Sequence, residues 1–336
     1  MSLLQYIAYP ALLILSLASI LFACELFTNG IEWTGKKLNL SDGATGSILA
    51  AVGTALPETS IPIIALLAGS AGSADVAIGA IAGAPFMLST LAFFVTGVAF
   101  YHFRKKGGRP ATLKVDVPVM SRDLGFFLAI YSTAFLTTFI HIHALRLVIA
   151  LLLMSSYGYY MYVTLRHEGD GAGELEELHL SKVFHADTAH NGFIAVQVLI
   201  SLGLIVAGAH FFVVSVEHVS AMIGVPAMLL SLLITPVATE LPEKMNSVLW
   251  IRGGKDTLAL GNITGAMVFQ SSFPVAVGVA FTPWALSGPT MVSAVIAILS
   301  AGLCYIMLKT KKALPPYVLL AGGGFYLAFI AYLIVF

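Results

Sequence analysis

Two glutamates lie inside strongly apolar stretches, and each directly follows a proline in the sequence Leu-Pro-Glu. They are Glu58 in GTALPE (53–58) and Glu243 in ATELPE (238–243). A charged side chain at the middle of a bilayer costs about 2.5–3.5 kcal/mol on insertion scales, so it needs a partner or a function. The proline before each glutamate lacks an N–H, so a carbonyl one turn earlier loses its helical hydrogen bond. Each glutamate is therefore expected near unpaired carbonyl oxygens.

Threonines accompany both glutamates at the same spacing. Thr54 and Thr239 each lie four residues before the glutamate. Carboxylate, hydroxyl and carbonyl oxygens together suit a hard cation such as Ca²⁺ or Na⁺ rather than zinc or copper. The alternative is a pair of proline-kinked helices whose glutamates only hydrogen-bond across the bundle. Because glutamate, proline and threonine recur in both stretches, the cation site is the favoured interpretation.

A second charged pair lies next to one of these glutamates. Glu240 and Lys244 are four residues apart with the acid first, which is the favourable order for an ion pair on a helix. One hypothesis is that Lys244 is a tethered cation that neutralises Glu240 or fills the space of a sodium ion. The other is that both side chains lie near the cytoplasmic end of their helix and extend toward water. The sequence leaves the two open.

The composition places these residues in a membrane. Of 336 residues, 58% are hydrophobic and 10% are charged, whereas soluble proteins are about 25% charged. The 17 basic and 17 acidic residues balance, so nothing indicates a nucleic-acid partner. Cys24 and Cys304 both lie in apolar segments and indicate neither a disulfide framework nor a metal-binding pair. We expect the lipid bilayer and metal-ion substrates as partners, and no resident cofactor.

Ten long apolar segments follow one another along the chain. They are apolar on all sides, unlike the alternating strands of a membrane barrel, and each is long enough to cross a bilayer as a helix. The predicted fold is an all-α polytopic membrane protein with ten transmembrane helices. The segments are residues 5–30, 44–68, 75–101, 123–140, 144–165, 191–216, 222–251, 258–282, 288–308 and 315–336.

Lysine and arginine are concentrated on one side of this ten-helix arrangement. Counted from the N-terminus, the odd-numbered loops hold 15 of the 17; Arg146 lies in an even-numbered loop and Lys244 within a segment. Positively charged loops stay in the cytoplasm. We therefore expect both termini outside, in a plasma (inner) membrane.

The two halves of the chain repeat one pattern. A shift of 185 residues aligns GTALPE with ATELPE without a gap, and each half holds five apolar segments. Because five is odd, the second half enters the membrane from the opposite side. We predict two inverted five-helix repeats, 1–165 and 191–336, joined by a cytoplasmic loop, 166–190. Inverted repeats with broken helices are typical of transporters that bind substrate near the midplane.

A glycine pair follows each Leu-Pro-Glu sequence, Gly79-xxx-Gly83 in the first half and Gly261-xxx-Gly265 in the second. Glycines at this spacing favour close packing of helices. The second segment also carries polar side chains, which we expect to line a cavity. They are Asn262, Thr264, Gln270, Ser271 and Ser272.

Together these motifs resemble the α-repeats of the Ca²⁺/cation antiporter superfamily, which includes the sodium/calcium exchangers. The resemblance implies alternating access, with Ca²⁺ and a counter-ion competing for one central site. On the family pattern, Glu58 and Glu243 match the two ion-binding glutamates, and Thr54 and Thr239 match the threonines that offer oxygens.

The chain also departs from that family pattern. The family has serine where this chain has Ala55 and Glu240, and an asparagine or aspartate where it has Leu88 and Gln270. Sodium coupling would need further oxygens, for which Gln270, Asn246, Ser271 and the backbone are candidates. Proton coupling has a direct route, because two carboxylates can take either one Ca²⁺ or two protons. Both coupling ions stay open.

The function expected from the sequence is a secondary-active antiporter that moves Ca²⁺ in exchange for Na⁺ or H⁺. Alternatives are an antiporter for another divalent cation, such as Mg²⁺ or Mn²⁺, and a passive cation channel. An enzyme is not expected, because the chain has no HExxH or GxSxG motif and no paired intramembrane aspartates.

Overall fold

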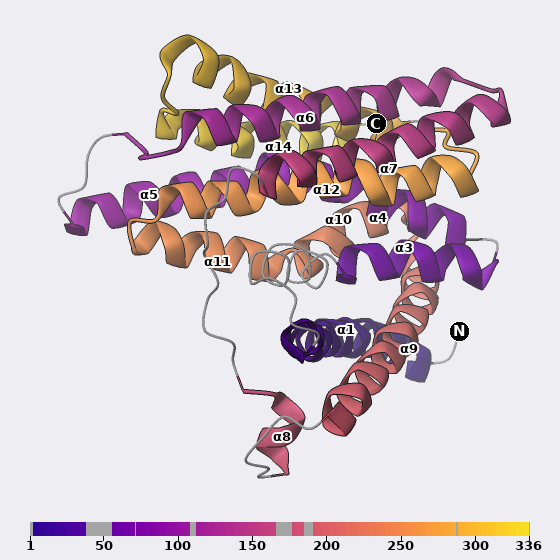
Figure 1. The fold of residues 1–336 in the computed structure, drawn as a ribbon. Helices are drawn as coiled ribbons and strands as arrows, with labels where there is room; N and C mark the ends of the chain where they lie inside the picture. The colour runs from indigo at the N-terminus through magenta and orange to yellow at the C-terminus, as the bar shows by residue number, and fades with distance from the viewer. Residues whose placement is uncertain are drawn as a thin grey trace. The chain divides into compact units, whose positions relative to one another are not determined.

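A computed structural model describes residues 3–37, 56–70, 72–107, 112–165, 177–184, 191–286 and 288–335. These residues form helices and short connections, with no strand among them (Figure 1). The elements are α1 (Leu3–Lys37), α3 (Leu56–Ala68), α4 (Ser73–Met87), η2 (Leu88–Ala92), α5 (Phe93–Gly107), α6 (Val117–Leu136), η3 (Thr137–Phe139), α7 (His143–Leu165), α8 (His179–Val183), α9 (Asn191–Ile223), α10 (Ala227–Thr239), α11 (Leu241–Arg252), α12 (Asp256–Phe281), α13 (Gly288–Lys311) and α14 (Pro316–Val335).

The all-helical membrane class predicted from the sequence is confirmed. Within the described ranges, 8 helices are long and apolar enough to cross a membrane, and two shorter apolar helices cover Leu56–Ala68 and Ala227–Val237. The shorter two lie within the predicted segments 44–68 and 222–251, which carry Leu-Pro-Glu. Helices α1 and α9 run past the apolar segments predicted for them, because their polar ends stay helical although hydropathy marks only the lipid-compatible part.

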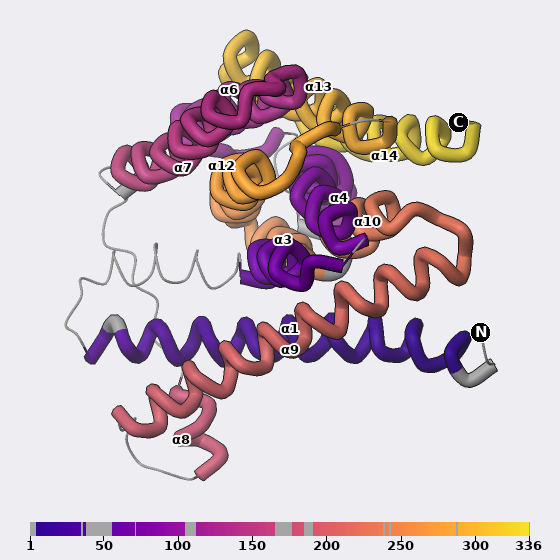
Figure 2. The backbone as a smooth tube through the Cα atoms, turned by 90° about the vertical axis from the view of Figure 1, so that its right-hand side faces the viewer, coloured from indigo at the N-terminus to yellow at the C-terminus, as the bar shows by residue number. Residues whose placement is uncertain are grey.

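The chain divides into two compact units, and the first comprises Met1–Val76 and Gly158–Ala227. Helices α1 and α9 lie side by side along much of their length in this unit (Figure 2). A Cβ added to Gly208 would lie 2.8 Å from Ile20 Cγ1, so the glycine lets the two helices approach closely. Gln197 on α9 donates to Asn29 on α1 (2.9 Å) and accepts from the backbone N–H of Leu180 on α8 (2.8 Å). Helix α3 packs against both long helices.

The second unit comprises Ala77–Tyr157 and Met228–Phe336. In it α12 and α13 pack against α6, and α14 packs against α5. Helices α4 and α5 are joined through the π-helical segment η2, a widened turn that is common at functional sites. The backbone of Gly322 on α14 approaches η2 so closely that an added Cβ would lie 2.4 Å from the Thr90 carbonyl oxygen. Each unit contains helices from both predicted repeats. The units therefore do not correspond to the two halves of the chain.

The first glycine pair brings α4 against α10. A Cβ on Gly79 would lie 2.2 Å from the Met228 carbonyl oxygen, and one on Gly83 would lie 2.3 Å from the Leu232 carbonyl oxygen. Pro236 has no N–H to offer that Leu232 carbonyl, so the α4 backbone covers the oxygen that the proline leaves free. Close packing therefore explains Gly79 and Gly83. It does not explain Gly261, whose Cβ would meet nothing within 4 Å.

We expect Gly79→Ala to lower the apparent melting temperature of the purified protein clearly, because the new methyl group must push the α10 backbone away. The matched control is Gly261→Ala at the equivalent repeat position, which has open space and gains up to about 1 kcal/mol of helix propensity. Equal melting temperatures for the two variants would contradict the close α4–α10 packing.

Candidate functional site

The second Leu-Pro-Glu sequence lies at a break between two helices of the second unit. Helix α10 ends at Thr239 and α11 begins at Leu241, and Glu240 between them has φ −87° and ψ 10°. The two helices remain linked by backbone hydrogen bonds from Glu240 N–H to the Pro236 carbonyl (3.2 Å) and from Lys244 N–H to the Glu240 carbonyl (3.1 Å). The predicted interruption is confirmed, and it places Glu240 and Glu243 at the start of α11.

Glu240 and Lys244 form the ion pair that their spacing predicts. Lys244 Nζ lies 3.1 Å from Glu240 Oε2 and donates a second hydrogen bond to the Pro236 carbonyl oxygen, at 3.0 Å. Glu240 is 1% exposed and Lys244 is 6% exposed. The ammonium group is thus held between two oxygens inside the protein. Extension of the lysine toward water, the second hypothesis from the sequence, does not fit this burial.

Glu243 is buried but its carboxylate is not fully used. The residue is 7% exposed, and its Oε2 has no hydrogen-bond partner among the residues that the structure describes. Its backbone carbonyl accepts a hydrogen bond from Asn262 Nδ2 of α12, at 3.4 Å. Ser247 one turn later donates to the Ala259 carbonyl (3.0 Å), so α11 is held to α12 at the glutamate and one turn after it. A carboxylate oxygen that is buried without a partner is a ready ligand for a cation.

The other predicted ligands of this unit divide into buried and exposed residues. Thr239 is fully buried, and its hydroxyl donates to the Thr235 carbonyl (2.9 Å), which leaves the oxygen lone pairs free to contact a cation. Gln270 and Ser271 on α12 are buried, and Ser271 donates to the Val268 carbonyl (3.0 Å). Asn246 lies on the exposed side of α11.

Glu58 belongs to the first unit. It lies in the first turn of α3, is 5% exposed, and shares the buried side of this helix with Ile61 and Ala65. Thr54, its predicted companion, and Ala55 lie outside the described residues. Across the described ranges, no three His, Cys, Asp or Glu side chains cluster closely enough to hold a metal ion by themselves.

Two buried acids were missed by the sequence reasoning: Asp256 at the start of α12, 1% exposed, which accepts a hydrogen bond from the Lys114 N–H (2.9 Å), and Asp123. Asp123 on α6 is 2% exposed, accepts a hydrogen bond from Thr264 on α12 (2.9 Å) and pairs with Arg122 (3.1 Å). It is the first residue of the predicted fourth segment, next to an arginine, and this position resembles a solvated helix end. The signal that could have found it is the polar Thr264 on the facing helix. The contact joins α6 to α12, the helix that also holds α11.

Comparison with known families gives a match over nearly the whole chain. The family described as sodium/calcium exchanger protein matches residues 8–166 and 193–336. CaxA of Alkalimonas amylolytica, named as a candidate antiporter, is 32% identical over 88 residues. That stretch covers 26% of this chain and 28% of the relative's length.

Solved structures with the same fold include two kinds of exchanger. The crystal structure of the H⁺/Ca²⁺ exchanger CAX is 16% identical, with a TM-score of 0.73 over 97% of this chain and 82% of that chain. The sodium-calcium exchanger NCX_Mj is 18% identical, with a TM-score of 0.58 over 97% of this chain and 98% of that chain. At these identities the likeness concerns the fold alone.

Proposed function

The chain belongs to the sodium/calcium exchanger family, and from this premise we propose that it is a secondary-active antiporter that exchanges Ca²⁺ for protons. Glu58 and Glu243 are the carboxylates that bind the ion, and Thr54, Thr239 and Gln270 add neutral oxygens. The protein binds the ion from one side of the membrane at a time. The ion is cargo, and no resident cofactor is needed.

The observation that carries this proposal is the contrast between two neighbouring glutamates on α11. Glu240 is neutralised by Lys244 at 3.1 Å, whereas Glu243 keeps a buried oxygen without a partner among the described residues. A buried carboxylate oxygen without a partner is costly unless it binds a cation or a proton. Glu243 is therefore the residue on which Ca²⁺ and the counter-ion compete.

The Lys244 ammonium supports protons rather than sodium as the counter-ion. It already contacts the Glu240 carboxylate and the Pro236 carbonyl, two oxygens that would otherwise be available to a second cation. With that pair neutral, Glu58 and Glu243 supply two negative charges. One Ca²⁺ or two protons cancel those charges equally, so the exchange is electroneutral.

The arrangement in the membrane completes the proposal. The two short apolar helices join the 8 long ones as interrupted crossings, giving ten. They form two inverted repeats with both termini outside the plasma (inner) membrane, and each repeat contributes one glutamate. This assignment is supported by the bias of lysine and arginine toward the odd-numbered loops.

Transport by the purified protein in liposomes tests antiport against passive flow. We expect Ca²⁺ to accumulate above its bath concentration when the vesicle interior is more acidic than the bath, and no such accumulation when the pH is equal on both sides. Ca²⁺ entry down its own gradient with no movement of protons in the opposite direction would identify a channel. Uptake of Mg²⁺ or Mn²⁺ but not Ca²⁺ under the same proton gradient would support the antiport mechanism but show that the transported ion is not Ca²⁺.

A further inference from the structure

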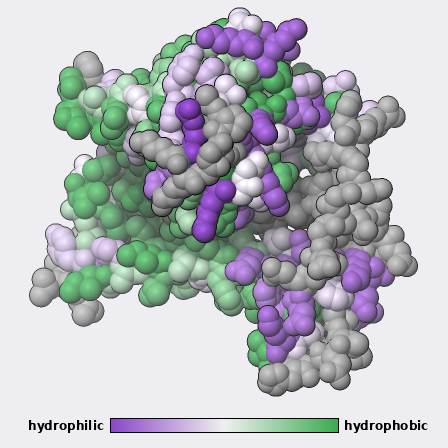
Figure 3. Space-filling view, turned by 90° about the vertical axis from the view of Figure 1, so that its left-hand side faces the viewer, coloured by the Kyte–Doolittle hydropathy of each residue, from purple (hydrophilic) through white to green (hydrophobic). Residues whose placement is uncertain are grey.

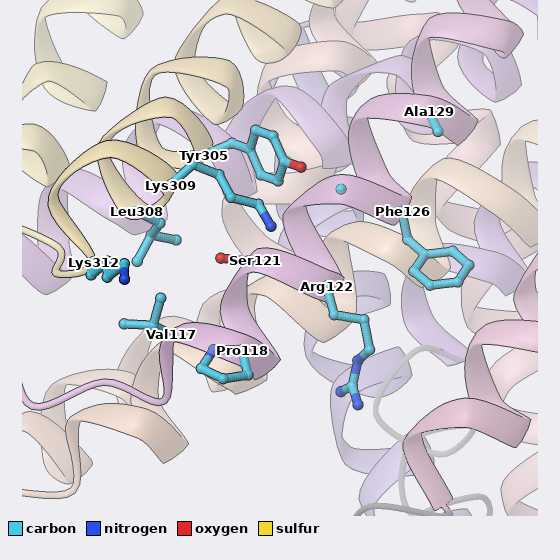
Figure 4. A pocket seen from close by; sticks show the side chains of 11 residues that line it. Val117, Pro118, Ser121, Arg122, Phe126, Ala129, Tyr305, Leu308, Lys309 and Lys312 are labelled. Carbon is cyan, nitrogen blue, oxygen red and sulfur yellow. The ribbon is translucent and has the colours of Figure 1, made fainter.

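An open pocket of about 860 Å³ lies between α6 and α13 of the second unit (Figure 4). Its wall on α6 includes Ser121 and Phe126, and its wall on α13 includes Tyr305, Leu308 and Lys309. None of the buried glutamates, Gln270 or the α11 residues lines it. The proposed transport function therefore gives this pocket no role.

The pocket is basic. Lys309 and Lys312 line it, no acidic residue does, and Arg122 stands at its rim with its guanidinium turned to Asp123. Lys309 Nζ lies over the Tyr305 ring, 5.5 Å from the centroid, and its ammonium points into the space between the helices. The start of α6 does not add to this charge, because the Asp116 carboxylate caps it and accepts a hydrogen bond from the Val119 N–H (3.0 Å). The two lysines favour an anion.

Ser121 gives an independent indication of a polar ligand. The residue is 7% exposed, and its buried Oγ has no hydrogen-bond partner among the described residues. Figure 4 shows this oxygen directed toward the same space as the Lys309 ammonium. Lysines at the end of α13 are expected in any case, because cations complement a helix C-terminus. That rule does not explain why α6, the facing helix, carries a buried serine hydroxyl that has no hydrogen-bond partner among the described residues.

The remaining walls of the pocket are apolar, and the pocket lies near polar residues at the ends of the helices. Val117, Phe126, Ala129 and Leu308 surround the charged part. The end of the second unit where α5 ends and α6 begins gathers hydrophilic side chains beside a hydrophobic flank (Figure 3). A pocket that offers cations at such an edge and apolar walls toward the membrane suits a ligand with an anionic head and hydrocarbon tails.

We propose that this pocket binds the phosphate of an anionic glycerophospholipid between α6 and α13. Lys309, Lys312 and the Ser121 hydroxyl contact the phosphate, and the apolar walls hold the start of the acyl chains. This site goes beyond the proposed function and does not rest on it, because lipid binding can be measured without transport.

Native mass spectrometry of the full chain in detergent tests the site, with phosphatidylglycerol as the anionic probe and phosphatidylcholine as the zwitterionic one. We expect the wild type to retain phosphatidylglycerol preferentially. Lys309→Gln/Lys312→Gln should weaken that binding at least 10-fold, and Ser121→Met, which fills the pocket and keeps the charges, should weaken it as well. The matched control is Lys311→Gln, because Lys311 belongs to the same helix end but contacts the Tyr317 hydroxyl (3.3 Å) and does not line the pocket.

The outcomes separate the possible ligands. Equal retention of the two lipids, or equal phosphatidylglycerol binding by wild type and both pocket variants, would overturn the proposal. Stabilisation of the wild type by inorganic phosphate as strong as that by phosphatidylglycerol would also overturn it, since the pocket would then be a simple anion site. A loss shared by the Lys311→Gln control would assign the effect to overall charge rather than to the pocket.

Discussion

Glu243→Gln is expected to lower the rate of Ca²⁺ uptake at subsaturating Ca²⁺ by at least about 100-fold. The amide keeps the shape of the side chain but removes one of the two charges that balance the ion. Removing one partner of a buried charge pair costs about 2–5 kcal/mol, and 100-fold corresponds to about 2.7 kcal/mol. Uptake by reconstituted vesicles at several Ca²⁺ concentrations measures the change.

The control for this variant is Glu177→Gln, the same chemical change on an exposed residue. It should transport like the wild type. Because Glu243 Oε2 has no partner among the described residues, an amide at that position breaks no hydrogen bond of this oxygen, and Glu243→Gln should fold normally. A well-folded variant with near-normal uptake would remove Glu243 from the ion site.

Lys244→Met is expected to have the second large effect, on stability and on sodium response together. It leaves the Glu240 carboxylate, 1% exposed, without its cation. Breaking a buried pair in this way costs about 3–5 kcal/mol, so the apparent melting temperature should drop. Added Na⁺ should restore part of that loss in the variant and leave the wild type unchanged, because the freed oxygens of Glu240 and Pro236 then accept a sodium ion.

The double variant Glu240→Gln/Lys244→Met separates charge from packing. It removes both charges, so it should recover most of the melting temperature and lose the response to Na⁺. A single Lys244→Met variant as stable as the wild type, with unchanged ion selectivity, would show that the lysine neither neutralises Glu240 nor takes the place of sodium.

Much of the fold could be predicted because membrane helices are marked by composition. Long apolar segments predicted the helices within 3–37, 117–139 and 288–335, and the proline before Glu243 predicted the break between α10 and α11. The helix ends could not be predicted in the same way, because polar residues such as Thr34 continue α1 beyond its apolar part. The π-helical turn η2 has no marker in the local sequence either. It packs against α14, a contact between segments far apart in the chain.

The candidate site was predictable where the chemistry depends on neighbours in the sequence. The ion pair of Glu240 and Lys244 follows from a spacing of four residues on a helix, and the structure contains it. Contacts between distant segments were not accessible in that way. The hydrogen bond from Thr264 to Asp123 joins residues 141 positions apart, and the sequence around Asp123 gives no reason to bury it.

The most direct test of the account is to count protons against Ca²⁺ in the same vesicles. Ca²⁺ uptake and proton release are recorded together, with the membrane potential set by a potassium gradient and an ionophore. The account predicts two protons for each Ca²⁺ and a rate that does not change with the potential, because Glu58 and Glu243 exchange two charges for two charges. Ca²⁺ uptake that follows an outward Na⁺ gradient with no proton release would contradict it.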